Sequence, residues 1–417
     1  MAHSRIGAGN TGGSLYSNGS LAVVAGDQVF LQGCTGRARD GREFVGQGDP
    51  AAQAEGAMQS VRQLLEEAGG RMEDICMVTN YTTQHSYRDQ VYPVIARHLA
   101  GVNPVSTGLV VKSLAEPCID FQIDAWAVLP RDRETGHERF RLTNARGGFL
   151  MPSLDFGNAK IVRANDHLFL QGQTGMTLDG RDFVGSGDPA KQAEAAMENV
   201  RELLADTGAD LDDICKVTIY ITDPSYRQIV YPVVARYLRD VQPVSTGVVV
   251  KELARPELDL EIDVFAMVSD AAQGRHERHG VTAANYLPGL DFPLSKAVRA
   301  GNFVFLQGQT GLALDGSGLV GRGDPAAQAE QAMQSVKILL EQTGACMEDI
   351  AKVTTYVTER EALASVSPVL GRHLRGVDPT STTVVMEALA DPELDVVIDV
   401  FAAIPATSDP GSIGPNE

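Results

Sequence analysis

Apolar and polar residues follow two rhythms along this chain, and the same succession of rhythms occurs three times. In the middle copy, apolar side chains take every second position over residues 258–268, with Glu261 and Asp263 among the polar residues between them. A period of two places the apolar set on one face of a β-strand and the carboxylates on the other. Earlier in this copy, apolar residues recur at every third or fourth position after Asp188, which predicts an amphipathic helix.

Each copy predicts the same order of secondary-structure elements. It begins with a hairpin of two short strands, Ala22–Val24 and Val29–Leu31 in the first copy, followed by a loop and an Asp-Pro pair. Aspartate suits a helix N-cap and proline the first helical position, so this pair predicts the start of a helix. The later elements of the second copy are a strand within residues 213–222, a helix over about Tyr226–Leu238, and strands over Ser245–Leu253 and Leu258–Val268. The unit is therefore predicted to be β-β-α-β-α-β-β, with both helices on one face of the sheet.

The three copies are related by an almost constant spacing. Gly33, Gly172 and Gly308 are equivalent, at intervals of 139 residues (33 to 172) and 136 residues (172 to 308). A period this long exceeds the roughly 20–50 residues of solenoid repeats and matches the size of an independent domain. The predicted domains are residues 1–135, 136–273 and 274–417.

The carboxylate-bearing face of each predicted sheet would be costly to bury without partners. We therefore expect it to meet the corresponding faces of the other two copies, with polar clefts at the joints between them. The predicted fold is α+β, with three tandem units arranged around an approximate threefold axis as an intrachain pseudo-trimer.

Composition narrows the possible partners. The 417 residues carry a formal charge of −19 and a pI near 4.8, which disfavours binding to nucleic acid. No apolar run approaches the roughly 20 residues of a membrane span, and no secretory signal pattern is present. We expect a cytoplasmic protein with a small-molecule partner and no membrane partner, although the pseudo-trimer could associate further.

The candidate chemistry includes no metal or cofactor. The five cysteines form no CxxC spacing and are interpreted as reduced core thiols, so a zinc site is not expected. Neither a Ser-His-Asp order nor a phosphate-binding loop is recognisable. Each copy is preceded by a His-x-Arg motif, interpreted as part of a connector rather than as catalytic: His3/Arg5, His137/Arg139 and His276/Arg278.

An ordered set of motifs resembles the Rid family (YjgF/YER057c/UK114) over nearly the whole chain. In the second copy the set comprises Phe-Leu-Gln-Gly-Gln-Thr-Gly, Asp-Pro-Ala-x-Gln-Ala-Glu, Pro-Val-Ser-Thr-Gly and Glu-Ile-Asp-Val-Phe-Ala. The resemblance implies chorismate-mutase-like units that form trimers with three clefts between neighbours. Fusion of three copies would supply the whole trimer in one chain and hold the joints at high effective concentration.

The resemblance also implies hydrolysis of imines and enamines to ketoacids and ammonia, by a site in which an arginine binds the substrate carboxylate. That arginine position holds Ser106, Ser245 and Ser381 in this chain. Serine cannot make the bidentate charged contact of arginine, so simple amino-acid-derived imines are expected to react slowly or not at all.

The family carboxylate that positions the attacking water corresponds to Gln122, Glu261 and Val397, so Glu261 is the candidate catalytic residue. We expect Gly247 and the Gln171-Gly172 pair to hold the nitrogen end of the substrate beside it. Crowding by Asp259 and Asp263 would raise the pKa of Glu261 and suit it to proton transfer. The alternative is that Glu261 pairs with a basic residue across a joint.

Other candidate substrate-binding residues follow the hairpin or occupy the fourth predicted strand. Arg88 and Arg227 could replace the missing cation, but a solvent-facing arginine on a helix is the simpler interpretation. The remaining candidates are Gln32, Gly33, Ser106, Thr107, Gly108, Gln171, Gly172, Ser245, Thr246, Gly247, Gln307, Gly308 and Ser381.

Two functions remain open at this point. The first is a hydrolase or deaminase acting on a small imine, enamine or related C=N compound. The alternative is a non-catalytic module of Rid type that binds a metabolite or a protein. The missing arginines favour the module, and the carboxylate of Glu261 favours the enzyme.

Overall fold

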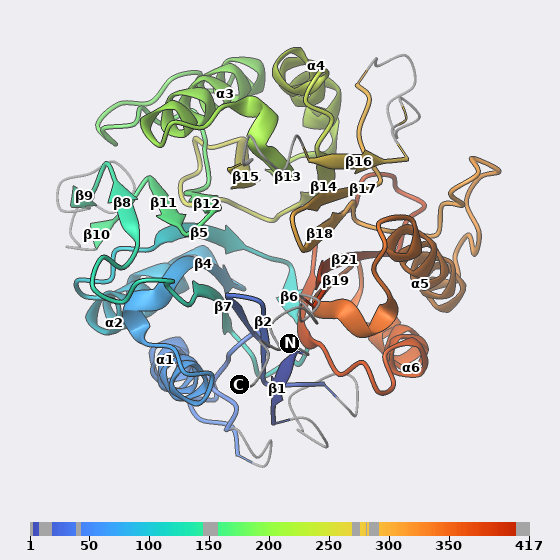
Figure 1. The fold of residues 1–417 in the computed structure, drawn as a ribbon, viewed down its shortest axis with the longest axis horizontal. Helices are drawn as coiled ribbons and strands as arrows, with labels where there is room; N and C mark the ends of the chain where they lie inside the picture. Colours follow the sequence, from blue (N-terminus) through green and yellow to red (C-terminus); the bar gives the residue numbers. More distant parts are fainter. Residues whose placement is uncertain are drawn as a thin grey trace, which may run out of the picture.

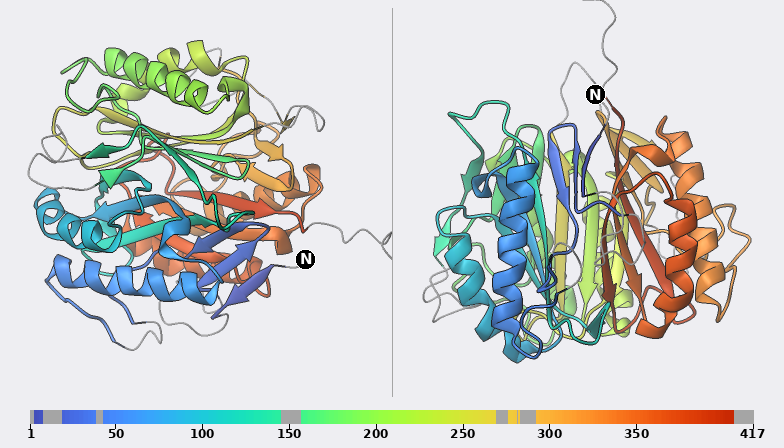
Figure 2. Two further views of the ribbon diagram at one scale, coloured as in Figure 1. Left: turned by 60° about the vertical axis from the view of Figure 1, so that its left-hand side comes forward. Right: turned by 90° about the horizontal axis from the view of Figure 1, so that it is seen from below.

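Three similar units surround a central axis, with their helices on the outside and their sheets facing inward (Figures 1 and 2). This computed structural model describes residues 3–7, 19–38, 43–144, 157–268, 276–280, 282 and 292–405. Unit 1 lies in the blue part of the chain, unit 2 in the green part and unit 3 in the orange part. The predicted α+β pseudo-trimer is confirmed.

The strands and helices have closely matching bounds in the three units. Unit 1 comprises β1 (Ser4–Ile6), β2 (Ala22–Ala25), β3 (Gln28–Leu31), α1 (Pro50–Glu67), β4 (Ile75–Thr82), α2 (Arg88–His98), β5 (Val105–Val110), β6 (Ser113–Leu114) and β7 (Phe121–Val128). Unit 2 comprises β8 (Glu138–Phe140), β9 (Thr143–Asn144), β10 (Gly157–Asn158), β11 (Ile161–Ala164), β12 (His167–Leu170), α3 (Pro189–Asp206), β13 (Ile214–Ile221), α4 (Arg227–Leu238), β14 (Val244–Val249) and β15 (Leu260–Met267). Unit 3 comprises β16 (Glu277–His279), β17 (Ala297–Ala300), β18 (Phe303–Leu306), α5 (Pro325–Gln342), β19 (Ile350–Val357), α6 (Leu363–His373), β20 (Thr380–Val385) and β21 (Val396–Ala403).

Each unit has one main sheet, β6 of unit 1 extends the sheet of unit 3 beside β20, and β9 and β10 form a separate two-stranded sheet. In unit 2 the order is β14-β13-β15-β12-β11-β8. The β13–β14 pair is parallel, because α4 connects the two strands, and the other pairs are antiparallel. The edge strand β8, like β1 and β16 in the other units, was not predicted. It is only three residues long, which is too short for a clear alternation of apolar and polar residues.

The two faces of β15 have the environments predicted from its alternation. Asp188 caps α3 by accepting a hydrogen bond from the Lys191 backbone at 3.1 Å, and α3 packs its apolar side against the sheet. One buried apolar cluster contains residues from both elements: Ala193, Ala196, Met197, Val200, Leu203, Leu204, Leu260, Ile262, Val264 and Ala266. The opposite face, with Glu261 and Asp263, points toward the other units and is also buried. Each Å² of apolar surface buried on the helix side contributes about 25 cal/mol of stability, and this burial holds each sheet to its helices.

The His-x-Arg motifs connect each unit to the one before it. His137 bonds the Val128 carbonyl at 2.7 Å, and Arg139 donates to the Glu73 carbonyl at 2.7 Å, although β8 belongs to the sheet of unit 2. His276 and Arg278 make the equivalent contacts with unit 2. His3 and Arg5 close the ring by contacting Ala403 and Glu348 of unit 3: the distances are 2.7 and 2.8 Å. The motif is therefore structural, as the sequence favoured.

The cysteines are unpaired, and burial differs among them. Burial raises the pKa of the Cys34, Cys76 and Cys215 thiols to about 12, so these three fit the prediction of inert core thiols. Cys118 is half-buried and Cys346 is exposed, so Cys346 does not belong to the core.

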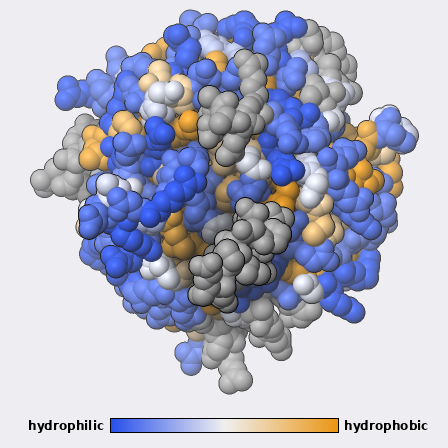
Figure 3. Space-filling model, viewed as in Figure 1, coloured by the Kyte–Doolittle hydropathy of each residue, from blue (hydrophilic) through white to orange (hydrophobic). Residues whose placement is uncertain are grey.

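The outer surface agrees with the composition. The face of the molecule in Figure 3 is mainly hydrophilic, with small, separated hydrophobic areas. None of the described helices combines the length and the apolar composition needed to cross a membrane.

Candidate active site

A threonine–aspartate hydrogen bond crosses each joint and identifies which strands meet there. In every case the threonine lies on the fourth predicted strand of one unit (β5, β14 or β20) and the aspartate on the last strand of the next. The pairs are Thr107–Asp263 at 2.5 Å, Thr246–Asp399 at 2.8 Å and Thr382–Asp124 at 2.6 Å. Each cleft is therefore built from two units, as the prediction of polar joints required.

The first cleft joins units 1 and 2 and contains Glu261. Unit 1 contributes β5 and α2, with Arg88 and Gly108, and unit 2 contributes Gly172 and Glu261. A Cβ on Gly172 would lie 1.9 Å from the Glu261 carboxyl oxygen Oε1, so only glycine fits beside this carboxyl. The charge of Arg88 also lowers the pKa of Glu261, which places the guanidinium near the carboxyl across the joint.

The prediction that Gly247 lies beside Glu261 is wrong. Gly247 lines the second cleft, between units 2 and 3, together with Gly308 and Val397. The fourth predicted strand of a unit faces the last strand of the following unit rather than that of its own unit. Gly108 therefore takes the place beside Glu261 that the sequence assigned to Gly247.

Arg88 and Arg227 are not solvent-facing, which corrects the interpretation made from the sequence. Their exposed fractions are 6% and 5%. Arg88 lies over the Tyr92 ring at 4.5 Å, and Arg227 donates from Nη1 to the Tyr231 hydroxyl at 2.9 Å. Each arginine is four residues before its tyrosine on a helix and thus on the same, inward face.

Gly108 on β5 and Gly247 on β14 leave space for these arginine–tyrosine pairs. A Cβ on Gly108 would lie 2.1 Å from the Tyr92 hydroxyl and 2.8 Å from Arg88 Nη1. A Cβ on Gly247 would lie 1.9 Å from the Tyr231 hydroxyl and 2.9 Å from Arg227 Nη1. Unit 3 has replaced all three members of this set, with Leu363, Ser367 and Thr383. The arginine, tyrosine and glycine thus form one structural device, present in the first two clefts.

The third cleft, between units 3 and 1, has no equivalent cation from α6. The Gly33 backbone N–H donates to the Ser381 carbonyl at 3.0 Å, and a Cβ on Gly33 would meet the Gln122 side chain at 2.8 Å. Gln122 replaces the carboxylate of Glu261 with a neutral amide. This joint is therefore closed by direct contact and lacks both charged groups of the first cleft.

Burial dominates the electrostatics of the first cleft. It raises the pKa of Glu261 well above its usual range, with a further increase from Asp263 and a decrease from Arg88. Burial also raises the pKa of Asp263 to about 7, opposed by hydrogen bonds from Thr107 and Tyr220. The sequence predicted the direction for Glu261 but gave crowding as the cause. Asp259 is not among the groups that shift this pKa, and it accepts a hydrogen bond from Gln192 at 2.6 Å.

The equivalent aspartates of the three units differ in their charge partners, because one of three buried lysines is replaced by methionine. Lys216 Nζ lies 2.7 Å from Asp399, and Lys352 Nζ lies 3.5 Å from Asp124. The equivalent residue of unit 1 is Met77, so Asp263 lacks the lysine that its two counterparts have. Reasoning from the sequence missed this difference, although the aligned repeats contain it.

A second group of lysines also escaped the sequence analysis. Lys160 and Lys296 precede the hairpins of units 2 and 3, where unit 1 has Leu21. Burial lowers the pKa of Lys160 to about 8 and lowers that of Lys296 as well. Lys296 Nζ donates to the Gln307 side chain at 2.8 Å. The backbone N–H of Gln171 donates to the Lys160 carbonyl, so Lys160 has the same place in unit 2.

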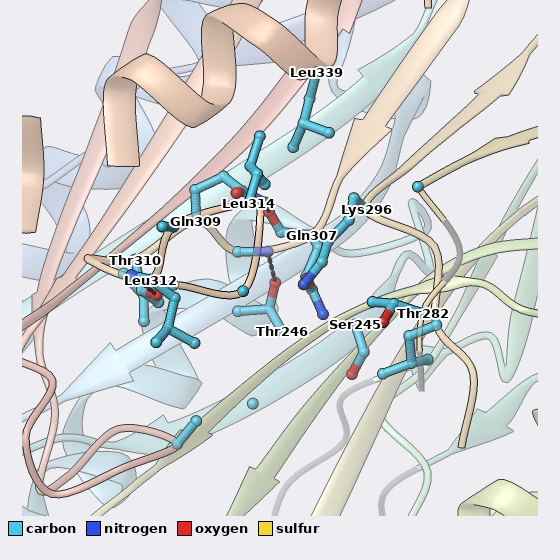
Figure 4. A pocket seen from close by; sticks show the side chains of 18 of the residues that line it. Ser245, Thr246, Thr282, Lys296, Gln307, Gln309, Thr310, Leu312, Leu314 and Leu339 are labelled. Carbon is cyan, nitrogen blue, oxygen red and sulfur yellow. Dashed lines mark hydrogen bonds between the residues drawn. The ribbon is translucent and has the colours of Figure 1, made fainter. Parts of the chain in front are cut away.

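The second cleft contains a cavity of about 560 Å³. Figure 4 shows Ser245, Lys296 and Gln307 around it, with the hydrogen bond from the Gly308 N–H to the Thr246 hydroxyl at 3.1 Å. Val397 takes the place of Glu261 here.

The predicted binding residues thus belong to three separate sites. The first cleft contains Arg88, Ser106, Thr107, Gly108, Gln171, Gly172 and Glu261, the second contains Arg227, Ser245, Thr246, Gly247, Gln307 and Gly308, and the third contains Gln32, Gly33 and Ser381. Within the described part of the chain, no group of three or more histidine, cysteine, aspartate or glutamate side chains is arranged to hold a metal ion.

Comparison with known proteins gives consistent matches to each unit. The sequence model described as endoribonuclease L-PSP matches three times, at residues 15–129, 156–268 and 289–404. A RutC family protein from Pyrococcus horikoshii is 31% identical over 111 residues, which cover 26% of this chain and 84% of that protein. A 2-iminobutanoate/2-iminopropanoate deaminase from Dermatophagoides farinae is 30% identical over 92 residues, 22% of this chain and 71% of the deaminase.

One solved structure resembles the chain beyond a single unit. The crystal structure of a chorismatase matches with a TM-score of 0.52 and covers 79% of this chain and 93% of its own. The sequence identity is 15%, so this likeness concerns the fold alone.

Proposed function

The chain belongs to the Rid family, whose sequence model matches it three times, and on this premise we propose that its first cleft hydrolyses a small imine or enamine with an anionic group. The family includes a relative named as a 2-iminobutanoate/2-iminopropanoate deaminase, which supports this reaction type. The reaction would convert a C=N compound and water into a carbonyl compound and an amine or ammonia.

The observation that carries this proposal is the position of two buried ionisable groups, a carboxyl and a guanidinium, on opposite sides of one joint. Glu261 is 5% exposed and Arg88 is 6% exposed. Arg88 replaces the cation missing at Ser106, from a helix instead of a strand, and would pair with the anionic group of the substrate. The C=N carbon would then lie toward Glu261.

The raised pKa of Glu261 suits it to act first as an acid and then as a base. Its protonated carboxyl would donate a proton to the substrate nitrogen, or to the β-carbon of an enamine, which makes the C=N carbon electrophilic. Water then attacks this carbon and gives its proton to the Glu261 carboxylate, forming a carbinolamine. Glu261 then passes this proton to the nitrogen, the C–N bond breaks, and the hydroxyl proton returns to the Glu261 carboxylate as the carbonyl forms, which restores the acid.

Glu261→Gln tests the proposal, because it keeps the side-chain volume and removes the acid. We expect turnover of the substrate to fall by about 10² or more, the usual loss for a general acid–base residue. Ammonia release would be measured from a panel of imines generated in solution, including 2-iminopropanoate and 2-iminobutanoate. Gln122→Glu is the matched control in the third cleft and should change turnover little. If Glu261→Gln keeps full activity on a substrate that the protein turns over, the proposal is wrong.

A further inference from the structure

Lys296 lies on the wall of the cavity of about 560 Å³ in the second cleft, immediately before β17. Its backbone is fixed on both sides: the N–H donates to the His279 carbonyl, and the carbonyl accepts from the Gln307 N–H, both at 2.9 Å. The side chains of Lys296 and Gln307 lie next to each other in Figure 4, and both residues are partly exposed. A small molecule in the cavity can therefore reach the amine of Lys296.

The amine of Lys296 has no carboxylate partner among the described residues. Its Nζ donates to the uncharged side chain of Gln307 at 2.8 Å. The other charged residues that line the cavity are Arg227 and Asp315, and Asp315 accepts a hydrogen bond from the Ser317 backbone at 2.9 Å. Burial lowers the pKa of Lys296, so a larger fraction of its amine is neutral at neutral pH than in an exposed lysine. The neutral amine is the nucleophilic form.

The cavity also has an apolar side, which is formed by four leucines. Three of them are labelled in Figure 4, and the set is Leu294, Leu312, Leu314 and Leu339. The cavity volume lies within the roughly 300–1,000 Å³ of small-molecule sites. A lysine that is partly desolvated in an apolar pocket is the residue with which proteins form Schiff bases with carbonyl compounds. The second cleft thus combines a reactive amine with an apolar wall.

We propose that Lys296 captures an aldehyde with an apolar chain as a reversible Schiff base in the second cleft. The neutral amine adds to the carbonyl carbon and forms the C–N bond, the C=O electron pair goes to oxygen, and one proton moves from nitrogen to oxygen. The nitrogen lone pair of this carbinolamine then expels the hydroxyl group, which takes a proton from solvent and leaves as water. Addition of water to the resulting protonated imine reverses the capture. The capture uses neither Glu261 nor Arg88 and is independent of the reaction proposed for the first cleft.

Hexanal with sodium cyanoborohydride tests this proposal, because the reductant converts a Schiff base into a stable secondary amine. The full chain would be incubated with limiting hexanal near neutral pH, and the modified lysines would be identified by peptide mass spectrometry. We expect Lys296 to gain a hexyl group at least about tenfold faster than Lys337, an exposed lysine on α5. The preference for Lys296 over Lys337 should be smaller with acetaldehyde, which has too short a chain to contact the leucines.

Lys296→Leu removes the amine and reproduces Leu21, the aligned residue of unit 1, so the fold should be retained. This variant should lose the fast modification, whereas Lys337→Met, the matched surface control, should keep it. The mapping on the unmodified protein is a test that does not depend on either variant. The proposal is overturned if Lys296 reacts no faster than Lys337, if fast modification persists in Lys296→Leu at another residue such as Lys160, or if hexanal and acetaldehyde show the same preference.

Discussion

At the scale of single residues, a methionine replaces the cation that could offset the burial of the carboxyls in the first cleft. Lys216 and Lys352 each stabilise an aspartate of the next unit, whereas Met77 gives Asp263 no charge partner. Asp263 and Glu261 are two residues apart on the same face of β15, so each also disfavours ionisation of the other. Because position 77 has no positive charge, the carboxyls of Glu261 and Asp263 retain protons near neutral pH.

Asp263 should make the stability of the protein depend on pH. Its pKa is raised from 3.8 to about 7 on folding, so the folded state binds the proton more tightly than the unfolded state. The free energy of unfolding should fall as pH rises from about 4 to about 7 and should then level off, by an amount on the order of a few kcal/mol. Asp263→Asn should reduce this slope, as measured by urea unfolding between pH 4.5 and 8.

Met77→Lys is the control for this prediction, since it supplies the cation that Asp399 already has. It should also reduce the slope, by lowering the pKa of Asp263 instead of removing the group. An unchanged slope in Asp263→Asn would show that another group causes the pH dependence.

Some residue roles could be predicted from the sequence and others could not. The resemblance to the Rid family made Glu261 a candidate, and alternation along the strand placed it on the inward face, where it lies buried. The burial of Arg88 was also accessible, since Arg88, Tyr92 and Ile95 share one helical face. The nearness of Arg88 to Glu261 was not accessible, because no local pattern specifies which neighbouring unit a strand will face.

At the scale of elements, the second helix of each unit and the strand that follows it (β5, β14 or β20) have side chains of matching size at their contact. α2 and α4 present arginine and tyrosine to a glycine on β5 or β14. α6 presents Leu363 and Ser367 to β20, which has Thr383. The same helix–strand contact therefore exists in two forms, one with an arginine and one with uncharged side chains only.

Exchanging one form for the other tests this fit. Gly108→Thr alone should destabilise the protein by about 1–3 kcal/mol, because the new side chain overlaps Tyr92 and Arg88. The triple variant Arg88→Leu, Tyr92→Ser, Gly108→Thr reproduces the set found in unit 3. It should lose less stability than the sum of the three single variants, as measured by urea unfolding. Strict additivity would contradict the coupling of these positions.

The order of elements was predictable because the relevant signals are local. The Asp-Pro starts and the helical periodicity located α1, α3 and α5, and the alternation located β7, β15 and β21. The edge strands β1, β8 and β16 were missed because their stabilising contacts are long-range. Arg139, for example, donates to backbone carbonyls of Glu73 and Ile75 in the preceding unit.

At the scale of the whole molecule, the three units share one interior. The single tryptophan, Trp126 of unit 1, lies 5.3 Å from Phe265 of unit 2 and 4.6 Å from Phe401 of unit 3, measured between ring centroids. The inward face of each sheet is buried only because the other two units cover it. The units are therefore expected to depend on one another for stability.

We expect the chain to unfold in one cooperative transition. Tryptophan fluorescence reports the shared interior and far-ultraviolet circular dichroism reports all three units, so the two urea curves should coincide. Arg139→Ala should lower the free energy of unfolding by about 1–3 kcal/mol, because it leaves backbone acceptors unpaired at one joint. The urea midpoint should fall accordingly, and the two curves should still coincide. Distinct transitions for the two probes would show that the units unfold independently.

Met77 stands where the other two units have Lys216 and Lys352, and this difference has a consequence for how such a protein can evolve. In a trimer of identical chains, a single mutation in the gene would remove all three lysines together and leave three buried aspartates without cations. Here the mutation reaches one joint, while the other two retain Lys216 and Lys352. Fusion thus confines a destabilising change to one joint, and each cleft is free to acquire its own chemistry.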